Sequence, residues 1–379
     1  MDEQLTPSAL RARGGLKWTF HPDGVLAAWV AEMDFGIAPA VTEALGAAVA
    51  RGDIAYPYPD LERAAAEAAC GFWEDRFGWK VSPDRVFSAP DVVEGLRRAI
   101  VHLTPSGSPV VLHTPVYYPF FSMVERAGRR LVEVPCRPDA EGRYRLDLDG
   151  IARQLGEGAG SVVLCNPWNP TGRSFSREEL EEVIDLAAAR SARVISDEVH
   201  GPLTRGGTEH LPAASLAPET VVTVTSASKA WNLPGLKCAQ VVLTKDRDVE
   251  TWSDYFTMDK VGVGTLGLVA NAAAYSDGRD WLDDVAMQLD SNQQLLGELM
   301  ADHLPDVGYS APQGTYLAWL DFRRYDLEDP AGYLLERAGV ALSSGSPFGL
   351  GGRGHARLNF ATAPPILTRI VERIGAALS

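Results

Sequence analysis

The sequence predicts an α/β protein with a large domain built on a mostly parallel, doubly wound sheet and a smaller α+β domain. From Arg85 onward, short β-branched runs alternate with helical patterns. The runs are apolar throughout instead of alternating with polar residues, which indicates a sheet buried on both faces. After Asn271 the pattern changes to long helical stretches and a few strand-like runs, which is typical of a second, smaller unit.

The expected elements follow in chain order. Helices are expected over residues 39–49 and 61–77, because apolar positions recur there at helical spacing. The segment between them contains Pro57 and Pro59, which forbid regular structure, so a loop is expected. Strands are expected at Val86–Phe87, Pro109–His113, Arg130–Val134, Ser161–Cys165, Arg193–Ser196, Val221–Thr225 and Gln240–Leu243. The smaller unit should hold a strand over Tyr316–Asp321, a helix from about Pro330 to Ala338 and a last strand over Ala356–Ala361.

Composition and charge exclude several classes of partner. Lys plus Arg number 35 against 50 Asp plus Glu, a net charge of −15 without a basic stripe, so nucleic acid is not an expected partner. The apolar stretches fall short of the roughly 18 residues of a membrane span. The N-terminal segment lacks a signal-peptide core, so we expect a cytoplasmic protein. The four cysteines have no paired spacing for a metal or for redox work and are expected to be buried thiols.

Three polar residues follow expected strands at the point where each strand ends. They are Asn169 in Asn-Pro-Trp-Asn-Pro-Thr-Gly, Asp197 in Ser-Asp-Glu-Val-His and Lys229 in Thr-Ser-Ala-Ser-Lys. Asp197 follows Asn169 by 28 residues and Lys229 follows Asp197 by 32, which are the spacings of successive βα units. The three side chains are therefore expected at one edge of the sheet.

An amide, a buried acid and a lysine are the groups that a pyridoxal phosphate (PLP) site requires. The lysine amine forms a Schiff base with the cofactor aldehyde, and a carboxylate beside the pyridine nitrogen keeps that nitrogen protonated. The amide of Asn169 would steady the ring hydroxyl. Each residue taken alone is weak evidence for a PLP site. The Ser-x-x-Lys pattern, for example, also occurs in serine hydrolases. Asp197 could also be a helix N-cap, a role that Ser196 could serve equally well.

With these motifs the sequence resembles the fold-type I PLP enzymes of aminotransferase class I/II. Within them it is similar to the MalY/PatB-type branch, the cystathionine and cysteine-S-conjugate β-lyases. The resemblance runs from Trp29–Phe35 to Arg357–Ala361 and covers nearly the whole chain. It implies that an N-terminal segment (residues 1–40) joins a small C-terminal domain (271–379), with the PLP-binding domain at 41–270 between them.

The resemblance implies a set of contacts to the cofactor phosphate. The Ser226 hydroxyl takes the place of a phosphate ligand, although a turn hydroxyl bonded to its own backbone is the alternative. Lys237 stands where related aminotransferases often carry arginine, so a looser phosphate contact is expected. Val92 and Val93 would donate main-chain N–H groups at a helix start. Many relatives have glycine where Asp91 stands, and we expect its carboxylate to point away from the phosphate.

The resemblance also assigns the residues around the ring and the substrate. Tyr117 matches the aromatic residue that stacks on the ring, and it is expected to contribute to catalysis and to contact the substrate together with Asn169. Arg357 matches the arginine that binds the substrate α-carboxylate, because planar bidentate pairing suits a guanidinium. Tyr56 aligns with a tyrosine that reaches the partner's phosphate across a homodimer interface, and Ala55 replaces the glycine that often precedes it.

The outcome of the reaction depends on fewer residues than the cofactor assignment does. His200 occupies a position where aminotransferases usually have tyrosine and the β-lyase branch tends to have histidine. Trp168 replaces a common histidine and would either reshape the pocket or merely pack. We expect a PLP-dependent carbon–sulfur β-lyase that cleaves an amino acid of the cysteine-thioether type. The alternative is an aminotransferase, and a PLP-sensing regulator with a DNA-binding domain is disfavoured because the family motif already starts by Trp29.

Overall fold

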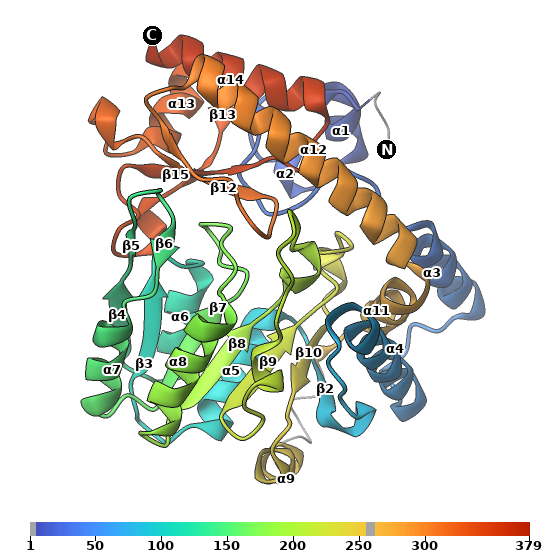
Figure 1. Cartoon of the computed structure of the whole chain (residues 1–379). Coiled ribbons are helices and arrows are strands. Elements are labelled where there is room, and N and C mark those ends of the chain that lie inside the picture. Colours follow the sequence, from blue (N-terminus) through green and yellow to red (C-terminus); the bar gives the residue numbers. More distant parts are fainter. Residues whose placement is uncertain (1–4, 255–261) are drawn as a thin grey trace.

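The computed structural model describes residues 5–254 and 262–379, so residues 1–4 of the expected N-terminal segment and 255–261 of the expected PLP-binding domain lie outside the described chain. The described chain contains a seven-stranded sheet of order β2-β10-β9-β8-β7-β3-β4 (Figure 1). Neighbouring strands from β9 to β4 are parallel, and β10 runs antiparallel to both of its neighbours. The strands are β2 Val86–Ala89, β3 Val110–Thr114, β4 Leu131–Pro135, β7 Ser161–Cys165, β8 Arg193–Asp197, β9 Val221–Thr225 and β10 Ala239–Val242. The predicted α/β class and mostly parallel sheet are confirmed.

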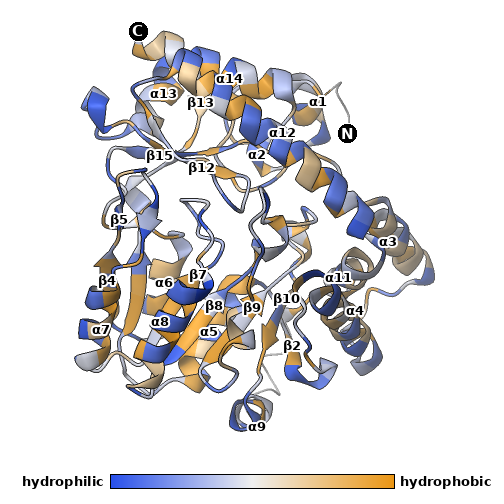
Figure 2. Ribbon diagram, in the orientation of Figure 1, coloured by the Kyte–Doolittle hydropathy of each residue, from blue (hydrophilic) through white to orange (hydrophobic). Residues whose placement is uncertain are grey.

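Helices cover both faces of this sheet, which is the reason that most of its strand residues are apolar (Figure 2). On β3, Val110 and Leu112 belong to one apolar cluster and Val111 belongs to the other. Because successive strand residues point to opposite faces, the two clusters are the two helix layers of a doubly wound domain. The layers contain α5 Val92–Leu103 and α6 Pro119–Arg126 on one side, and α7 Leu148–Gly156 and α8 Arg177–Ala188 on the other. The helix α9 Asp246–Asp254 packs beside α5.

A second sheet belongs to the smaller unit, in the upper half of Figure 1, and has the order β11-β12-β15-β14. Its strands are β11 Gly308–Tyr309, β12 Leu317–Asp321, β14 Ser343–Ser344 and β15 His355–Asn359. The helices of this unit are α12 Arg279–His303, α13 Pro330–Ala338 and α14 Pro364–Leu378, and the last helix packs on the other two. A hairpin of β5 Arg137–Pro138 and β6 Tyr144–Arg145 rises from the large sheet toward this unit (Figure 1).

The N-terminal segment is tied to the smaller unit by backbone pairing. The strand β1 Leu26–Ala27 pairs in parallel with β13 Val340–Ala341, after the short helices α1 Pro7–Arg13 and α2 Leu16–Thr19. The helices α3 Pro39–Arg51 and α4 Pro59–Phe77 pack against α11 Thr265–Asp277. The boundary expected at residue 270 therefore falls inside α11, and we propose that the smaller unit begins at Gly278, between α11 and α12. Short 3-10 turns are Pro83–Arg85, Gly201–Leu203, Ala213–Ser215, Pro234–Leu236, Arg323–Tyr325 and Ser346–Phe348.

The expected elements differ from the observed ones at their ends, while the short strands β1, β5, β6, β11, β13 and β14 were not expected. The helix expected from Leu61 begins at Pro59, because proline is well suited to the first helical position, where its missing N–H is not needed. The last strand ends at Asn359 instead of Ala361, because the Thr362 N–H turns back to the Phe360 carbonyl. All four cysteines are buried and free, as expected. Within residues 5–254 and 262–379, none of the helices combines the length and apolar character of a membrane span.

Candidate active site

Three strand ends of the large sheet converge on one pocket. Asp197 ends β8, while Asn169 and Lys229 each lie four residues beyond the ends of the flanking strands β7 and β9. In the parallel register Asp197 pairs with Cys165 on one side and Val224 on the other, so the three carboxyl ends are level. All three side chains line a pocket with a volume of about 430 Å³. The structure thus brings together the three residues that the sequence placed at one edge.

The Lys229 amine is held by the N-terminal segment. Its Nζ donates to the main-chain oxygen of Ala31 at 3.0 Å, and the Tyr316 hydroxyl donates to the same oxygen at 2.9 Å. Burial, followed by the positive charge of Arg357, lowers the pKa of Lys229 from its ordinary 10.5 to about 8. The lowered pKa enlarges the neutral fraction of the amine near physiological pH, and the neutral form is the nucleophile and proton acceptor that a reactive lysine requires.

Asp197 is a buried carboxylate that makes few contacts. Its Oδ1 accepts the Val199 N–H at 3.0 Å, and the Cys165 thiol lies 3.9 Å from its Oδ2. Burial raises the pKa of Asp197 to about 7, and the Val199 N–H partly offsets that effect. A cationic N–H placed against this carboxylate would hold it ionised, which is what a protonated pyridine nitrogen supplies. Neither Asp197 nor Ser196 is a helix N-cap: the Val199 contact is a local turn contact, the next helical turn has His200 as its N-cap residue without a side-chain bond, and the Ser196 hydroxyl has no partner among the described residues.

Arg357 joins the smaller unit to this edge. One of its terminal nitrogens donates to Asn169 Oδ1 at 2.8 Å, and the other donates to the Trp29 carbonyl and to Ser343 Oγ, each at 3.0 Å. Its guanidinium lies over the Phe348 ring, 5.1 Å from the centroid. Its Nε is buried and has no partner in residues 5–254 and 262–379. Arg357 is outside the residues that line the pocket, but its contact with Asn169 places it at the pocket wall.

Two aromatic residues predicted for the ring also line the pocket. His200 is buried, its ring lies 5.9 Å from that of Tyr316, and its Nδ1 has no partner within the described chain. Burial and the neighbouring charge of Lys229 lower the pKa of His200, so the imidazole is neutral. Burial raises the pKa of Tyr117 to about 12, so its phenol stays protonated. These groups offer hydrogen bonds to a ring without adding charge.

The helix α5 begins at the other end of the pocket, where Val92 and Val93 form part of the lining. The first turn of a helix leaves main-chain N–H groups without intrahelical partners. The expectation that the Asp91 carboxylate points away from the cofactor phosphate stays a prediction. Asp91 Oδ1 accepts the Glu94 N–H at 2.9 Å as the N-cap, and its Oδ2 pairs with Lys237 Nζ at 3.0 Å. The carboxylate is therefore a counter-ion for Lys237, and the amides of Val92 and Val93 stay available.

The remaining predicted contacts differ in position. The Ser226 hydroxyl lines the pocket, but it donates to the Cys238 carbonyl at 2.6 Å and accepts the Ser228 N–H at 3.0 Å. Ser226 therefore makes the backbone turn contacts that were the alternative reading of this residue. Tyr56 lies in the loop between α3 and α4, is 81% exposed and is not part of the pocket lining. Its role at a subunit interface stays a prediction.

Trp168, one of the departures from the family motif, is fully buried and packs. Its indole N–H donates to the Pro115 carbonyl at 2.7 Å, and its ring stands edge-on to His113 with centroids 4.4 Å apart. Sequence reasoning missed Ala31 and Ser343, which contact Lys229 and Arg357. The Ala31 contact is made by a main-chain carbonyl, which carries no side-chain signature.

The fold and this site define the class of protein. A doubly wound α/β domain with a lysine, a buried carboxylate and an amide at the carboxyl edge of its sheet is a fold-type I PLP-dependent enzyme. The model of the family "Aminotransferase class I and II" matches residues 30–374, and the chain belongs to that family.

The chain is also similar to individual proteins over nearly its full length. It is 40% identical to a cystathionine β-lyase of Corynebacterium glutamicum, over 97% of this chain and 98% of the relative. It is 35% identical to the cystathionine β-lyase PatB of Bacillus subtilis, over 95% and 94%. Among solved structures, the PLP-bound C-S lyase from Staphylococcus hominis superposes with a TM-score of 0.90 at 27% identity, over 97% of this chain and 96% of that one.

Proposed function

We propose that the protein is a PLP-dependent carbon–sulfur β-lyase that cleaves cysteine thioethers such as cystathionine to a thiol, pyruvate and ammonia. The observation that carries the proposal is the convergence of Lys229 and Asp197 on one pocket, with Arg357 bonded to Asn169 at its wall. The names of relatives that are about 40% identical over nearly the whole chain support the lyase outcome.

The residues of the pocket fit PLP. In the part of the chain that the structure describes, Asp197 has no ion-pair partner, His200 Nδ1 has no hydrogen-bond partner and the first turn of α5 has N–H groups without intrahelical partners. These groups suit a pyridine nitrogen, a ring hydroxyl and a phosphate respectively. When bound, PLP supplies an electron sink for the bonds at the substrate α-carbon. The residues proposed to hold it are Lys229, Asn169, Asp197, His200, Tyr117, Ser226, Lys237, Val92, Val93 and, from a partner subunit, Tyr56.

The side chains of Arg357 and Lys229 are proposed to bind the substrate and to accept a proton from it. Arg357 is placed to bind the α-carboxylate of the amino acid, and its Nε, which has no partner among the described residues, is a donor left for that purpose. Lys229, with its lowered pKa, is placed to accept the α-proton. Loss of that proton and breakage of the Cβ–S bond release the thiol, and water then converts the three-carbon fragment to pyruvate and ammonia.

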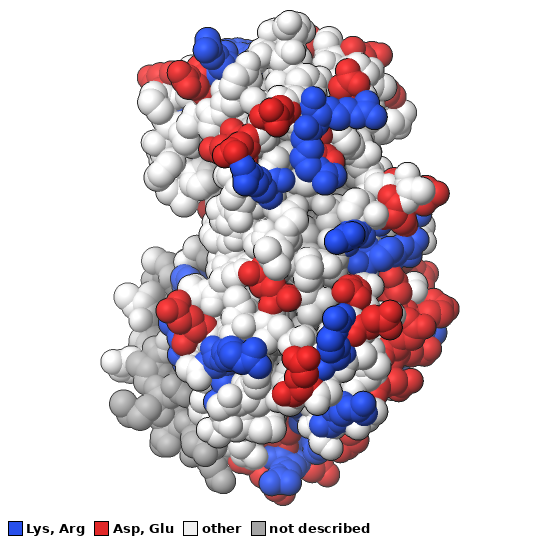
Figure 3. Space-filling view, turned by 90° about the vertical axis from the view of Figure 1, so that its left-hand side faces the viewer, with Lys and Arg blue, Asp and Glu red and all other residues white. Residues whose placement is uncertain are grey.

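Two further proposals concern the assembly and location of the protein. We propose a homodimer, which the 81% exposure of Tyr56 supports, because a tyrosine that reaches a partner's phosphate must project from its own subunit. We also propose that the protein acts in the cytoplasm, which its four free, buried cysteines support. Charges of both signs are interspersed over the face in Figure 3, a pattern that does not favour nucleic acid as a partner.

An aminotransferase is the second candidate, because the matched family is named for that activity. The experiment that separates the two follows the thiol and the keto acid with L-cystathionine as substrate. A lyase regenerates its starting state in each cycle and releases thiol and pyruvate continuously without added keto acid. An aminotransferase stops after about one turnover until a keto acid is supplied. Sustained thiol release in the absence of keto acid is the expected result, and turnover that is thiol-free and needs a keto acid would overturn the proposal.

A further inference from the structure

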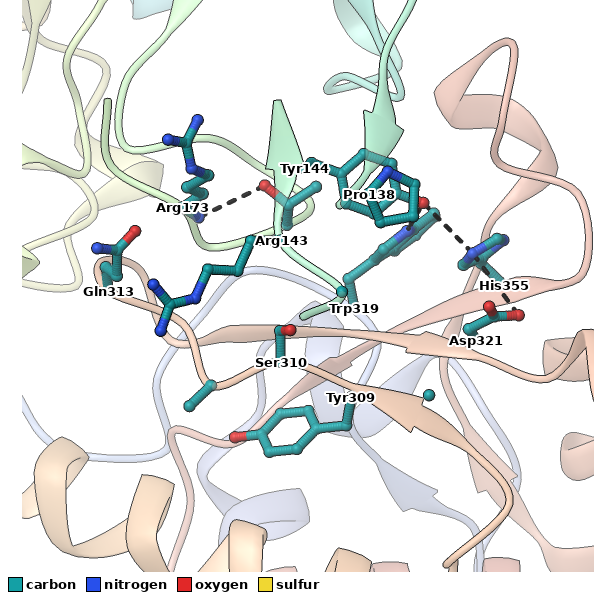
Figure 4. A pocket seen from close by; sticks show the side chains of 14 residues that line it. Pro138, Arg143, Tyr144, Arg173, Tyr309, Ser310, Gln313, Trp319, Asp321 and His355 are labelled. Atoms are coloured by element: carbon teal, nitrogen blue, oxygen red, sulfur yellow. Dashed lines mark hydrogen bonds and ion pairs between the residues drawn. The ribbon is translucent and has the colours of Figure 1, made fainter. Parts of the chain in front are cut away.

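A second pocket lies where the large and small units meet, apart from the PLP pocket (Figure 4). The large unit contributes residues of the β5–β6 hairpin, among them Arg143 and Tyr144, and the small unit contributes residues of β12 and β15, among them Trp319 and His355. Its cavity has a volume of about 110 Å³. The pocket and the Lys229 pocket have no lining residue in common.

One end of this pocket is a rigid aromatic wall. The Trp319 and His355 rings are stacked, with centroids 5.0 Å apart and planes inclined by 9°. The Trp319 indole N–H donates to the Tyr144 hydroxyl at 3.3 Å, which ties the wall to the hairpin. Asp321 lies at the same end, but Arg323 neutralises it with two hydrogen bonds of 2.6 and 2.9 Å. This end therefore suits a small apolar body.

The opposite end, which carries Arg143 and Gln313 in Figure 4, has an uncompensated positive charge. Within residues 5–254 and 262–379, no acidic side chain pairs with the exposed Arg143 guanidinium. Of the hairpin's two acids, Asp139 is engaged by the Arg145 side chain at 2.9 Å and by the Arg143 main-chain N–H at 2.8 Å, and the exposed Glu141 forms no ion pair with Arg143 in the described chain. The Gln313 Oε1 accepts the Ser174 N–H at 3.3 Å, so the donor side of this amide remains for a ligand.

We propose that this pocket binds a short-chain carboxylate, with the carboxylate on Arg143 and Gln313 and the alkyl part against Trp319. A guanidinium and an amide N–H are the donors that a carboxylate prefers. The cavity volume of about 110 Å³ limits the ligand to a small acid. Butyrate, with six heavy atoms, is a probe of that size.

The position of the pocket couples this ligand to the substrate residues. Trp319 is the direct cross-strand partner of Arg357, and His355 precedes Arg357 by two residues on the same face of β15. On the other wall, Thr171 follows Asn169 by two residues. A bound carboxylate would therefore bridge the segments of the two units that carry Asn169 and Arg357. Its binding does not depend on whether the protein is a lyase or an aminotransferase.

The test is a titration of butyrate into the PLP-loaded protein, followed by ligand-detected NMR. The titration uses Arg357→Ala as the background, because this variant lacks the arginine proposed to bind a carboxylate in the active site. Arg143→Gln is compared with Arg137→Gln, which makes the same charge change on an exposed hairpin side chain outside this pocket. We expect butyrate binding to persist in the background, to weaken about tenfold or more with Arg143→Gln, and to change less than about twofold with Arg137→Gln. Butyramide, which lacks the charge, should bind about tenfold more weakly than butyrate.

A second measurement covers the possibility that Arg357→Ala is unstable. In the protein that retains Arg357, butyrate should lower kcat for cystathionine even at saturating substrate. Arg143→Gln should abolish this inhibition at saturating substrate and should leave kcat without butyrate unchanged. Butyrate binding that disappears with Arg357→Ala in a folded protein, inhibition that substrate overcomes completely, or equal effects of the two arginine variants would each overturn the proposal.

Discussion

The Lys229 amine and the Ala31 carbonyl are joined by a hydrogen bond of 3.0 Å across 198 residues of sequence. The Tyr316 hydroxyl donates to the same oxygen at 2.9 Å, so the carbonyl keeps a partner when the lysine turns to the cofactor. This contact explains why the N-terminal segment is part of the site, although it belongs with the smaller unit by its β1–β13 pairing.

The lowered pKa of Lys229 predicts the pH dependence of PLP uptake by protein freed of cofactor. Only the neutral amine attacks the aldehyde, so the rate of uptake should rise about tenfold per pH unit below the lysine pKa of about 8 and level off above it. Stopped-flow absorbance of the yellow product between pH 7 and 9.5 measures this midpoint. Glu32→Gln should move the midpoint downward, because the Glu32 carboxylate raises the pKa of Lys229. A rate that keeps rising toward pH 10.5 contradicts the assignment.

Asp197→Asn should separate the catalytic role of Asp197 from its structural role. In the cofactor-free protein the Asp197 pKa is raised from 3.8 to about 7. Between pH 3.8 and about 7 the Asp197 carboxyl therefore stays protonated in the folded state and is ionised in the unfolded chain. Stability of the wild type therefore falls as pH rises through this window and is lowest above pH 7. Asparagine avoids that loss and retains the oxygen that accepts the Val199 N–H.

The expected result for cofactor-free Asp197→Asn at pH 8 is a free energy of unfolding higher than that of the wild type by about 1 kcal/mol or more. Turnover of the PLP-loaded variant should nevertheless fall by about 10²-fold, because a preorganised charge is lost. Urea unfolding and steady-state turnover measure the two effects. A variant that is less stable and whose folded fraction turns over normally would make Asp197 a structural residue.

Substitutions at Arg357 and at Ser343 should weaken substrate binding to different extents. Arg357→Lys removes the bidentate fork, and the loss of charge-assisted hydrogen bonds should raise KM for cystathionine by about 10- to 100-fold. Ser343→Ala removes only one contact to the guanidinium and should raise KM by about fivefold. Ser344→Ala is the matched control, because that hydroxyl bonds the exposed Asp329 instead. Equal KM values for Ser343→Ala and Ser344→Ala would contradict the positioning role.

The fold and the large-sheet part of the site could be read from the sequence because local signals carried them. Continuous apolar runs mark strands buried on both faces, and the strand ends bring Asn169, Asp197 and Lys229 to one edge. What could not be read depends on contacts between distant segments. The ion pair of Asp91 with Lys237 joins residues 146 positions apart, and the contact of Arg357 with Trp29 joins residues 328 positions apart. No spacing or periodicity encodes such pairings.

Tyr56 gives the last prediction, because its exposed side chain can act only if a second subunit meets it. If it reaches the partner's phosphate, Tyr56→Phe and Lys229→Ala each disable both sites of their own homodimers. In a heterodimer of the two, one site combines the intact Tyr56 of one chain with the intact Lys229 of the other. Co-refolding the variants at equal amounts should give about half heterodimers by random pairing, and so about one quarter of wild-type activity per site, as simple dimer statistics require. Differently tagged chains and tandem purification show whether heterodimers form. Heterodimers without activity, formed from a Tyr56→Phe chain that is inactive alone, would place the role of Tyr56 within its own subunit.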